Sequence, residues 1–412
     1  MNEKLLVKNI GVLQTAVGNG KHSGAAQGEN IKLKNAAILI ADGMIEEITS
    51  EGVLPQGAGS AGLVIDAEGN LVTPGLVDAH THLVFGGYRQ HEIPLKLRGA
   101  EYLEILKAGG GILDTLKKTR AAGADELYAK SAGFLDEMLA LGVTTCEAKS
   151  GYGMDFENEI KQLNVIKKLA GEHPADIVPT YLGAHAVPDE YKGRPDEYIA
   201  MVCEKVMPYV AENKLAEYCD IFCEDSAYDV SQSRKYLLRA RELGMGLKIH
   251  ADEIEAIGGA RLAGELNADS AEHLIATDEE GMRALAGSGT VAVLLPGTSF
   301  YLGKQYAQAR RMIELGIPVA MATDFNPGSC PSPNMQLIIN MGYLKYRMTP
   351  EEILTAVTIN AACAIGRGSV AGTLEKGKQG DLVIWDAPDM EMLCYRFGSN
   401  LALQVIKKGE LV

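Results

Sequence analysis

The sequence has no long apolar run, no surplus of basic residues and no paired cysteine motif, and each absence narrows the class of protein. No apolar stretch approaches the roughly 18 residues that a helix needs to span a bilayer, and the charged first eight residues do not resemble a signal peptide. The net charge of −15 argues against a nucleic acid or an anionic membrane as partner. The seven cysteines are dispersed, which is typical of reduced thiols and predicts a cytoplasmic protein.

The length of 412 residues predicts one large domain and one smaller domain. Both ends of the chain are rich in short strand-like runs and turns. These include residues 4–10 and 31–40, the turn at Asp42-Gly43, a Gly-rich loop at 18–28, and the runs 382–385 and 405–412. We therefore expect residues 1–70 and 366–412 to form one small β-sandwich domain, with residues 71–365 inserted between its halves.

The middle of the chain repeats one pattern: a strand-like run ends in polar residues, and a helical stretch follows it. The runs are residues 71–82, 142–147, 177–185, 221–224, 246–250, 268–273, 291–296 and 318–324. Helical stretches between them include residues 124–141, 157–169, 197–212, 231–243 and 305–315. Eight alternating units predict an α/β fold, a distorted (β/α)8 TIM barrel.

The polar residues fall at the carboxyl ends of these expected strands, where such barrels carry out catalysis. They are His80, His82, Glu147, His185, Glu224, His250, His273 and Asp324, and they include five of the eight histidines in the chain. His80 and His82 are two residues apart, so a strand would direct both imidazoles to the same side. A lone His-x-His pair is a weak signal, and each residue alone could be a satisfied core histidine or a turn residue.

Together, His80, His82, His250 and Asp324 at one barrel mouth would form a mononuclear metal site with room for water. A bound metal lowers the pKa of that water to about 7, which makes hydroxide available at neutral pH. Such a site needs a carboxylate to transfer the proton. Glu253, three residues after His250, is the candidate, and the alternative is a solvated loop glutamate.

The motif Pro74-Gly75-Leu76-Val77-Asp78-Ala79-His80-Thr81-His82, followed by His250, His273 and Asp324, resembles the amidohydrolase superfamily over nearly the whole chain. Longer motifs resemble its imidazolonepropionase family. These are Phe85-Gly86-Gly87-Tyr88-Arg89, Glu147-Ala148-Lys149-Ser150-Gly151-Tyr152-Gly153, Tyr181-Leu182-Gly183-Ala184-His185, His250-Ala251-Asp252-Glu253 and Asp324-Phe325-Asn326-Pro327-Gly328-Ser329. The resemblance implies hydrolysis of the ring amide of 4-imidazolone-5-propanoate to N-formimidoyl-L-glutamate in histidine degradation, with one zinc or iron.

The resemblance also assigns roles to individual residues. It makes His80, His82, His250 and Asp324 the metal ligands, and it gives catalytic roles to Glu253, His273 and Asp324. Glu253 would transfer the proton, and His273 would hydrogen-bond the developing oxyanion. The implied substrate contacts are Arg89, Tyr152, His185, Asn326, Gly328 and Ser329.

One departure from part of the superfamily concerns the number of metals. Dinuclear members carry a carboxylated lysine on the fourth strand, whereas the fourth run here ends Phe222-Cys223-Glu224. Lys149 lies on the second run, so we interpret it as a structural residue or one behind the ligands. A single metal is therefore favoured.

The residues implied as substrate contacts have side chains that suit this substrate, although each could instead have only a structural role. A propanoate tail suits the bidentate fork of Arg89, which without the family match would be a solvated loop arginine. The segment from Asn326 to Ser329 could be only a turn, or its N–H groups could bind a carboxylate. Tyr152 lies between glycines that could form a flexible turn, and His185 could be a buried structural histidine.

The nearest alternative is another metal hydrolase on the same scaffold, a deaminase or a cyclic amidase, which would differ at Arg89 and Tyr152. A non-catalytic scaffold of the same fold should have lost metal ligands, and this chain keeps them all. The expected binding partner is a small-molecule substrate, and neither a nucleic acid nor a membrane. The oligomeric state that we consider is a homodimer.

Overall fold

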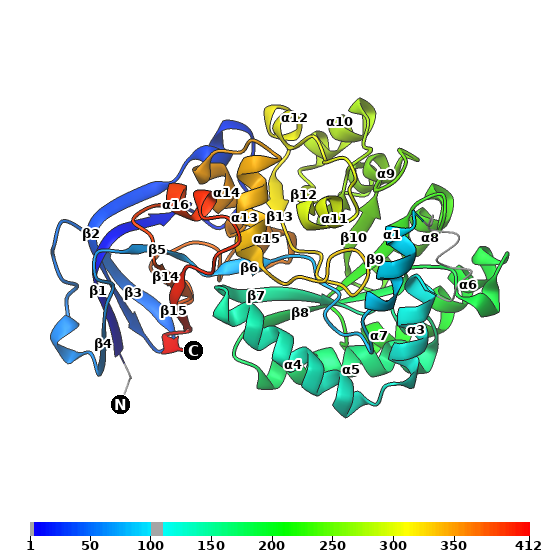
Figure 1. The fold of residues 1–412 in the computed structure, drawn as a ribbon, viewed down its shortest axis with the longest axis horizontal. Coiled ribbons are helices and arrows are strands. Elements are labelled where there is room, and N and C mark those ends of the chain that lie inside the picture. Colours follow the sequence, from blue (N-terminus) through cyan, green and yellow to red (C-terminus); the bar gives the residue numbers. More distant parts are fainter. Residues whose placement is uncertain (1–3, 100–109) are drawn as a thin grey trace.

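The computed structural model describes residues 4–99 and 110–412, and its strands form two separate sheets (Figure 1). Residues 1–3, at the start of the expected terminal domain, lie outside the described residues. One sheet is built from both ends of the chain, and the other is a parallel sheet with helices around it. Figure 1 shows the blue and red terminal strands together on one side of the barrel.

The terminal sheet joins segments that are more than 300 residues apart, because β5 pairs with β1 on one side and with β14 on the other. The Asp42-Gly43 turn links β2 to β3 as predicted, and both residues have positive φ (51° and 76°), as a type I′ turn requires. The strands are β1 (Lys4–Thr15), β2 (Ile31–Ala41), β3 (Met44–Thr49), β4 (Leu63–Asp66), β5 (Leu71–Pro74), β14 (Leu382–Trp385), β15 (Ala402–Lys407) and β16 (Glu410–Leu411).

The second sheet confirms the predicted barrel, because eight parallel strands follow one another in sequence order from β6 to β13. A parallel bridge between Thr81 and Phe325, just beyond β6 and β13, brings the first and last strands together. The strands are β6 (Leu76–Asp78), β7 (Val143–Lys149), β8 (Asp176–Ala184), β9 (Tyr218–Cys223), β10 (Gly246–Ala251), β11 (Ser270–His273), β12 (Val291–Leu294) and β13 (Val319–Met321).

Most barrel strands are followed by a helix that packs its apolar face on the sheet. The described helices are α1 (Ile93–Leu97), α3 (Ile112–Ala121), α4 (Ala124–Ala140), α5 (Phe156–Glu172), α6 (Pro195–Met201), α7 (Met207–Glu212), α8 (Val230–Glu242), α9 (Gly259–Glu265), α10 (Glu279–Ser288), α11 (Pro296–Tyr301), α12 (Ala309–Glu314), α13 (Met335–Leu344), α14 (Pro350–Ala356), α15 (Ile359–Ala364) and α16 (Met390–Tyr395). Short turns are Gly24–Gly28, Ala58–Ser60, Gln90–Glu92, Asp189–Tyr191 and the π-helical Val202–Val206.

Two expected helices differ from the prediction. The stretch 197–212 is interrupted by the π-helical turn Val202–Val206, just before Pro208. Proline has no N–H to donate to the carbonyl four residues earlier, which breaks the α-helical ladder at this point. The stretch 305–315 is helical only over Ala309–Glu314.

The run 71–82, predicted as one strand, is divided between the two sheets at Gly75. β5 ends at Pro74 in the terminal sheet, and β6 begins at Leu76 in the barrel. A Cβ on Gly75 would lie 2.2 Å from Thr144 Oγ1, so only glycine allows the chain to pass this close to β7.

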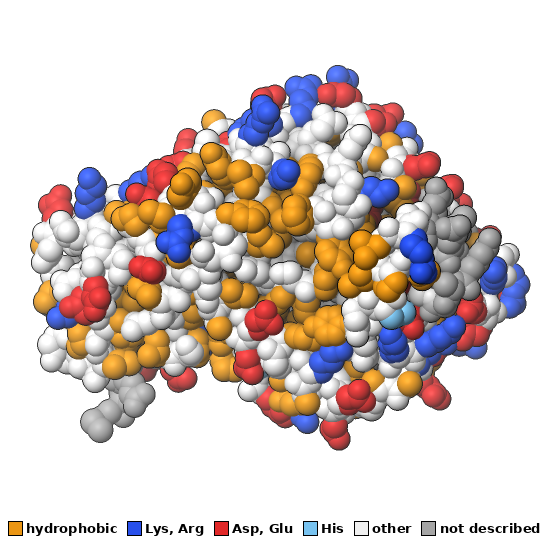
Figure 2. Space-filling view, viewed as in Figure 1, with side chains coloured by type: hydrophobic (Ala, Val, Ile, Leu, Met, Phe, Trp, Pro, Cys, Tyr) orange, Lys and Arg blue, Asp and Glu red, His pale blue; other side chains and the backbone are white. Residues whose placement is uncertain are grey.

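The predicted loop at residues 18–28 is attached to the barrel by side-chain hydrogen bonds, among them those of Gln27 and of Asn360, which bonds the backbone of His22. Gln27 is fully buried, donates to the carbonyl of Val319 (3.0 Å) and accepts from its N–H (3.1 Å). In the described ranges, no helix combines the length and apolar character that crossing a bilayer requires. Acidic and basic side chains are interspersed over the face drawn in Figure 2.

Candidate metal centre

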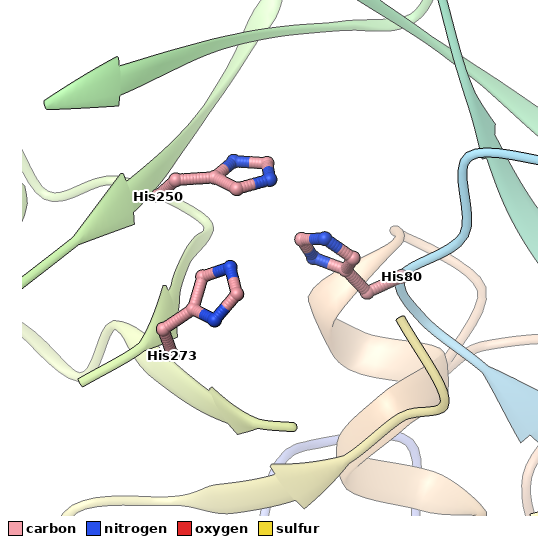
Figure 3. A group of neighbouring side chains, drawn as sticks. All are labelled: His80, His250 and His273. Carbon is pink, nitrogen blue, oxygen red and sulfur yellow. The ribbon is translucent and has the colours of Figure 1, made fainter. Parts of the chain in front are cut away.

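Donor atoms of His80, His82 and Asp324 lie within 4.8 Å of one another at the carboxyl end of the barrel, and His250 adjoins His82. His82 Nε2 lies 3.2 Å from His80 Nε2 and 3.5 Å from His250 Nε2. Asp324 Oδ1 lies 3.5 Å from His80 Nε2 and 3.4 Å from His82 Nε2. The two adjacent histidines follow β6, His250 ends β10 and Asp324 follows β13, so the barrel closure creates the cluster. Figure 3 shows His80, His250 and His273 directed towards one another, His80 from the loop after β6 and the other two from separate strands.

The spacing of this cluster fits a divalent metal ion. Ligand bonds of about 2.05 Å in a tetrahedron place neighbouring donor atoms about 3.35 Å apart. The three donors His80, His82 and Asp324 are separated by 3.2–3.5 Å, and His250 lies 3.5 Å from His82. Burial lowers the pKa of His80 and of His82 well below the usual value, so both rings are neutral and offer a lone pair. The neutral imidazoles of His80 and His82, close to the carboxylate of Asp324, are a suitable donor set for a cation.

A buried carboxylate orients the third histidine. His250 Nδ1 lies 3.1 Å from Asp220 Oδ1, so its Nε2 is left to face the cluster. Asp220 also accepts from Lys149 Nζ at 2.7 Å, and Lys149 lies 2.8 Å from Glu147. Burial alone would lower the pKa of Lys149, but Asp220 and Glu147 outweigh it and raise the pKa above its usual value. Lys149 thus lies behind His250 as seen from the candidate cluster.

Two residues at the strand ends around the cluster have a strained backbone. Asp324 and His273 have φ values of 54° and 68°, in the left-handed region that non-glycine residues rarely occupy. Asp324 is held there by its N–H, which donates to the carbonyl of His80 (3.0 Å), and by Thr298, which donates to its Oδ2 (2.5 Å). Such strain persists only where the surroundings fix it, and it is common at functional sites.

The expected acid–base residues lie beside the cluster. Glu253 Oε2 is 3.5 Å from His273 Nε2, and both side chains line the same pocket. Burial raises the pKa of Glu253 above its usual value. Burial also lowers the pKa of His273, to about 3, so this ring is neutral at pH 7.

A pocket opens over the cluster and contains most of the predicted site residues. Of the predicted residues, His80 and Gly328 are not part of its wall. The wall is formed by His82, Arg89, Ile112, Tyr152, His185, Phe222, His250, Glu253, His273, Asp324, Asn326 and Ser329. Residues from seven barrel strand ends or the loops after them are thus brought together as the barrel topology predicts.

Arg89 is fixed in the pocket wall by a buried partner. Its Nε and Nη2 donate to Glu92 at 2.8 and 3.1 Å, and the Glu92 side chain is fully buried. Its Nη1 lies against Gly328, where an added Cβ would be only 2.0 Å away. One edge of the guanidinium is therefore occupied by Glu92, and the position of the other depends on Gly328 having no side chain.

The N–H groups of the loop from Asn326 to Ser329 donate hydrogen bonds within the loop itself. Asn326 Oδ1 accepts from the N–H of Gly328 and of Ser329, both at 2.8 Å. These are the backbone donors that the sequence offered for a carboxylate, and in the structure they are already used. The loop instead presents the side chains of Asn326 and Ser329 to the pocket and packs against Arg89.

Tyr152 and His185 form an aromatic wall beside the metal cluster. The ring of His185 stacks on His82 with centroids 4.9 Å apart and an interplanar angle of 15°, and Tyr152 lies 5.4 Å from His185. The Tyr152 loop is held by Glu159, which accepts from the N–H groups of Gly153 (2.8 Å) and Met154 (2.7 Å). Tyr152 is therefore not in a flexible turn.

Comparison with known proteins agrees with this geometry. Residues 71–412 match the amidohydrolase family. The chain belongs to this family. The imidazolonepropionase of Alkaliphilus metalliredigens is 50% identical over 413 residues, which cover 99% of this chain and 97% of that protein. The imidazolonepropionase of Bacillus velezensis is 50% identical over 408 residues, covering 99% and 96%.

These identities place the chain within the imidazolonepropionase family of amidohydrolases. The zinc-complexed structure of atrazine chlorohydrolase from Arthrobacter aurescens has the same fold. It aligns with a TM-score of 0.71 at 17% identity and covers 99% of this chain and 94% of that one.

The amidohydrolase pocket also contains residues that the sequence did not single out. Ile112 and Phe222 line it, Glu92 holds Arg89, and Asp220 holds His250. Asp220 and Phe222 could have been found from the sequence. They are two residues apart on a strand, so they share a face with the strand-end residue Glu224. No spacing rule connects Glu92 with the pocket, since it lies in a short turn.

Proposed function

We propose that the chain is a cytoplasmic imidazolonepropionase, which hydrolyses the ring amide C–N bond of 4-imidazolone-5-propanoate to N-formimidoyl-L-glutamate in histidine degradation. The main support is the four-donor cluster of His80, His82, His250 and Asp324 at the floor of a pocket, in a chain about half identical to imidazolonepropionases. The arginine in the pocket wall suits the propanoate group of this substrate.

The four donors would hold one zinc or iron ion per chain. A bound divalent ion supplies Lewis acidity, which activates water and polarises a carbonyl group. Lys149 supports a single ion, because its ammonium is paired with Asp220 and Glu147 and is not available to form a bridging carbamate. His250 keeps its Nε2 aimed at the donors through the contact of its Nδ1 with Asp220.

Glu253 is the proton-transfer residue in this proposal. Its carboxylate takes a proton from the attacking water while the water oxygen bonds to the ring carbonyl carbon. The bond from that carbon to the ring nitrogen then breaks, and Glu253 returns the proton to the leaving nitrogen. The products are the new carboxylate and the formimidoyl group on the amino nitrogen, so no other reactant is needed.

His273 and Asp324 support this proton transfer. His273 lies beside Glu253, where it hydrogen-bonds the oxyanion that develops on the ring carbonyl. Asp324 directs Oδ1 to the histidines while its Oδ2 accepts from Thr298, so its orientation is fixed on both sides. A fixed carboxylate at this position keeps the donor geometry constant through the reaction.

Substrate recognition rests on a cation and an aromatic wall. Arg89 binds the propanoate carboxylate through the guanidinium edge that Glu92 does not occupy. Tyr152 and His185 contact the flat ring, and Asn326 and Ser329 border the propanoate end of the pocket.

The test uses purified protein, elemental analysis and the candidate substrate. We expect about one zinc or iron per chain, and formation of formimidoyl glutamate that stops after chelation and returns with added metal. Two metals per chain would contradict the mononuclear site. Turnover of a nucleobase or another cyclic amide in place of imidazolone propanoate would contradict the substrate assignment.

A further inference from the structure

Glu224, at the end of β9, binds the backbone of an active-site loop through its side-chain carboxylate. The side chain is buried, with 1% of its surface exposed. Its Oε2 accepts from the N–H of Ile254 at 2.9 Å, and its Oε1 accepts from the N–H of Glu255 at 3.3 Å and of Asp225 at 3.2 Å. A carboxylate that accepts several backbone N–H groups fixes their positions firmly.

Glu253 immediately precedes this held segment, and the residue before it is also fixed. Asp252 Oδ1 accepts from the N–H of Gly259 (3.1 Å), and its Oδ2 accepts from Thr277 Oγ1 (3.1 Å). Asp252 has a φ of 50°, which is a strained value for a residue other than glycine. Glu253 therefore lies between two anchored neighbours, in a segment that is neither helix nor strand.

We infer that Glu224 is a positioning residue for the proton-transfer step, which acts by holding the backbone on the carboxyl side of Glu253. This inference rests on the proposed role of Glu253. The two carboxylates repel one another, so Glu224 cannot hold Glu253 directly and acts through the N–H groups of Ile254 and Glu255. The fixed backbone aims Glu253 at His273 and at the donor cluster.

This arrangement predicts which kinetic constant depends on Glu224. Glu224 is not part of the pocket wall, so its loss leaves the substrate contacts in place. A shift of about 1 Å in a catalytic group can cost roughly 100-fold in rate. Glu224→Gln, which removes the charge and one acceptor, should therefore lower kcat roughly 10- to 100-fold and change KM less than about threefold.

A double-mutant cycle separates this role from a general structural one. Glu224→Gln, Glu253→Gln and the double variant are compared for kcat, metal content and thermal unfolding. If Glu224 acts through Glu253, adding Glu224→Gln to Glu253→Gln costs less than about twofold in kcat. If the second substitution costs its full 10-fold or more, Glu224 acts by another route and the inference is wrong.

Glu159→Gln is the matched control, because Glu159 is also a buried carboxylate that accepts loop N–H groups. It holds Tyr152 instead of Glu253, so its effect should fall mainly on KM and persist in the Glu253→Gln background. Equal behaviour of the two variants in that background would overturn the inference. If Glu224→Gln yields no folded protein, Glu224→Asp, which withdraws the carboxylate by one methylene, is tested in the same cycle.

Failure of this inference can be told apart from failure of the proposed function. Absence of turnover by the unmodified enzyme on imidazolone propanoate would contradict the function itself. Normal turnover by the unmodified enzyme together with normal kcat in Glu224→Gln would contradict only the positioning role.

Discussion

Asp220 Oδ1 lies 3.1 Å from His250 Nδ1, and both side chains are buried inside the barrel. This contact fixes which ring nitrogen of His250 is free to bind metal, because the nitrogen facing the carboxylate carries the proton. Lys149 holds Asp220 from the other side, so buried charged side chains, and not solvent, orient the ring of His250.

We therefore expect Asp220→Asn to weaken metal binding roughly 10- to 100-fold while the fold is retained. The measurement is titration of metal-free protein with zinc in competition with a chromogenic chelator. Asp381→Asn is the control, because Asp381 is a buried carboxylate paired with Lys407 in the terminal sheet. Equal zinc affinities for the two variants would show that Asp220 does not orient the ligand.

Glu253→Gln should lower kcat roughly 100-fold or more, because the amide keeps the shape of the side chain but cannot accept a proton. The metal content should remain that of the unmodified protein, since Glu253 is not among the four donors. Steady-state kinetics with elemental analysis of the same samples measures both. Turnover close to normal would transfer the role to His273.

Arg89→Lys should raise KM and lower kcat/KM for imidazolone propanoate, because a point charge replaces a bidentate fork. Loss of a charge-assisted hydrogen bond to the substrate corresponds to roughly 30- to 150-fold in kcat/KM. Arg89→Ala alone would remove both guanidinium contacts of the buried Glu92 and leave it only Lys96 Nζ (3.3 Å) and the N–H of Gly111 (2.7 Å), so the protein should be less stable. The alanine variant should therefore be combined with Glu92→Gln.

The discriminating comparison uses a substrate analogue that lacks the carboxylate. Arg89 variants should lose activity on imidazolone propanoate and keep most of their activity on the analogue. An equal loss on both would mean that Arg89 is not the carboxylate-binding residue.

Gly328→Ala should mimic part of the Arg89 defect without removing the charge. The added Cβ would lie 2.0 Å from Arg89 Nη1, so the guanidinium has to move away from its present position. We expect an increase in KM with normal metal content. Gly133→Ala in α4 is the control, because nothing lies within 4 Å of its added Cβ, and it should leave the kinetics unchanged. A normal KM for Gly328→Ala would show that the position of Nη1 is not critical.

The barrel and the clustering of the candidate metal donors at its mouth could be predicted from the sequence because both follow from local patterns. Polar residues that repeatedly follow apolar runs mark strand ends, and parallel strands bring such ends together. His80 and His82 were recognisable by their spacing of two, and their Nε2 atoms are indeed 3.2 Å apart. Most of the pocket wall also comes from strand ends or the loops that follow them, but Ile112 belongs to α3 and was not predicted.

The contacts that orient these residues were not predicted. Arg89 with Glu92 and Asn326 with the N–H groups of its own loop are local pairs, but the sequence does not show whether such a side chain is used locally or by a ligand. The contacts of Asp220 with His250 and Lys149 join different strands, and no local pattern connects them. The division of residues 71–82 at Gly75 was missed for a similar reason. The apolar pattern continues on both sides of the glycine, and only pairing with distant strands decides which sheet each half joins.

The division at Gly75 means that the terminal sheet and the metal centre share one short length of chain. Pro74 is the last residue of β5 in one sheet, Leu76 is the first of β6 in the other, and His80 follows four residues later. Gly75 is packed closely against Thr144, so this short length of chain cannot shift at one end without shifting at the other. Tightening of the ligands on metal loading should therefore slow amide hydrogen exchange in β5 and in its neighbour β14, although neither strand touches the site.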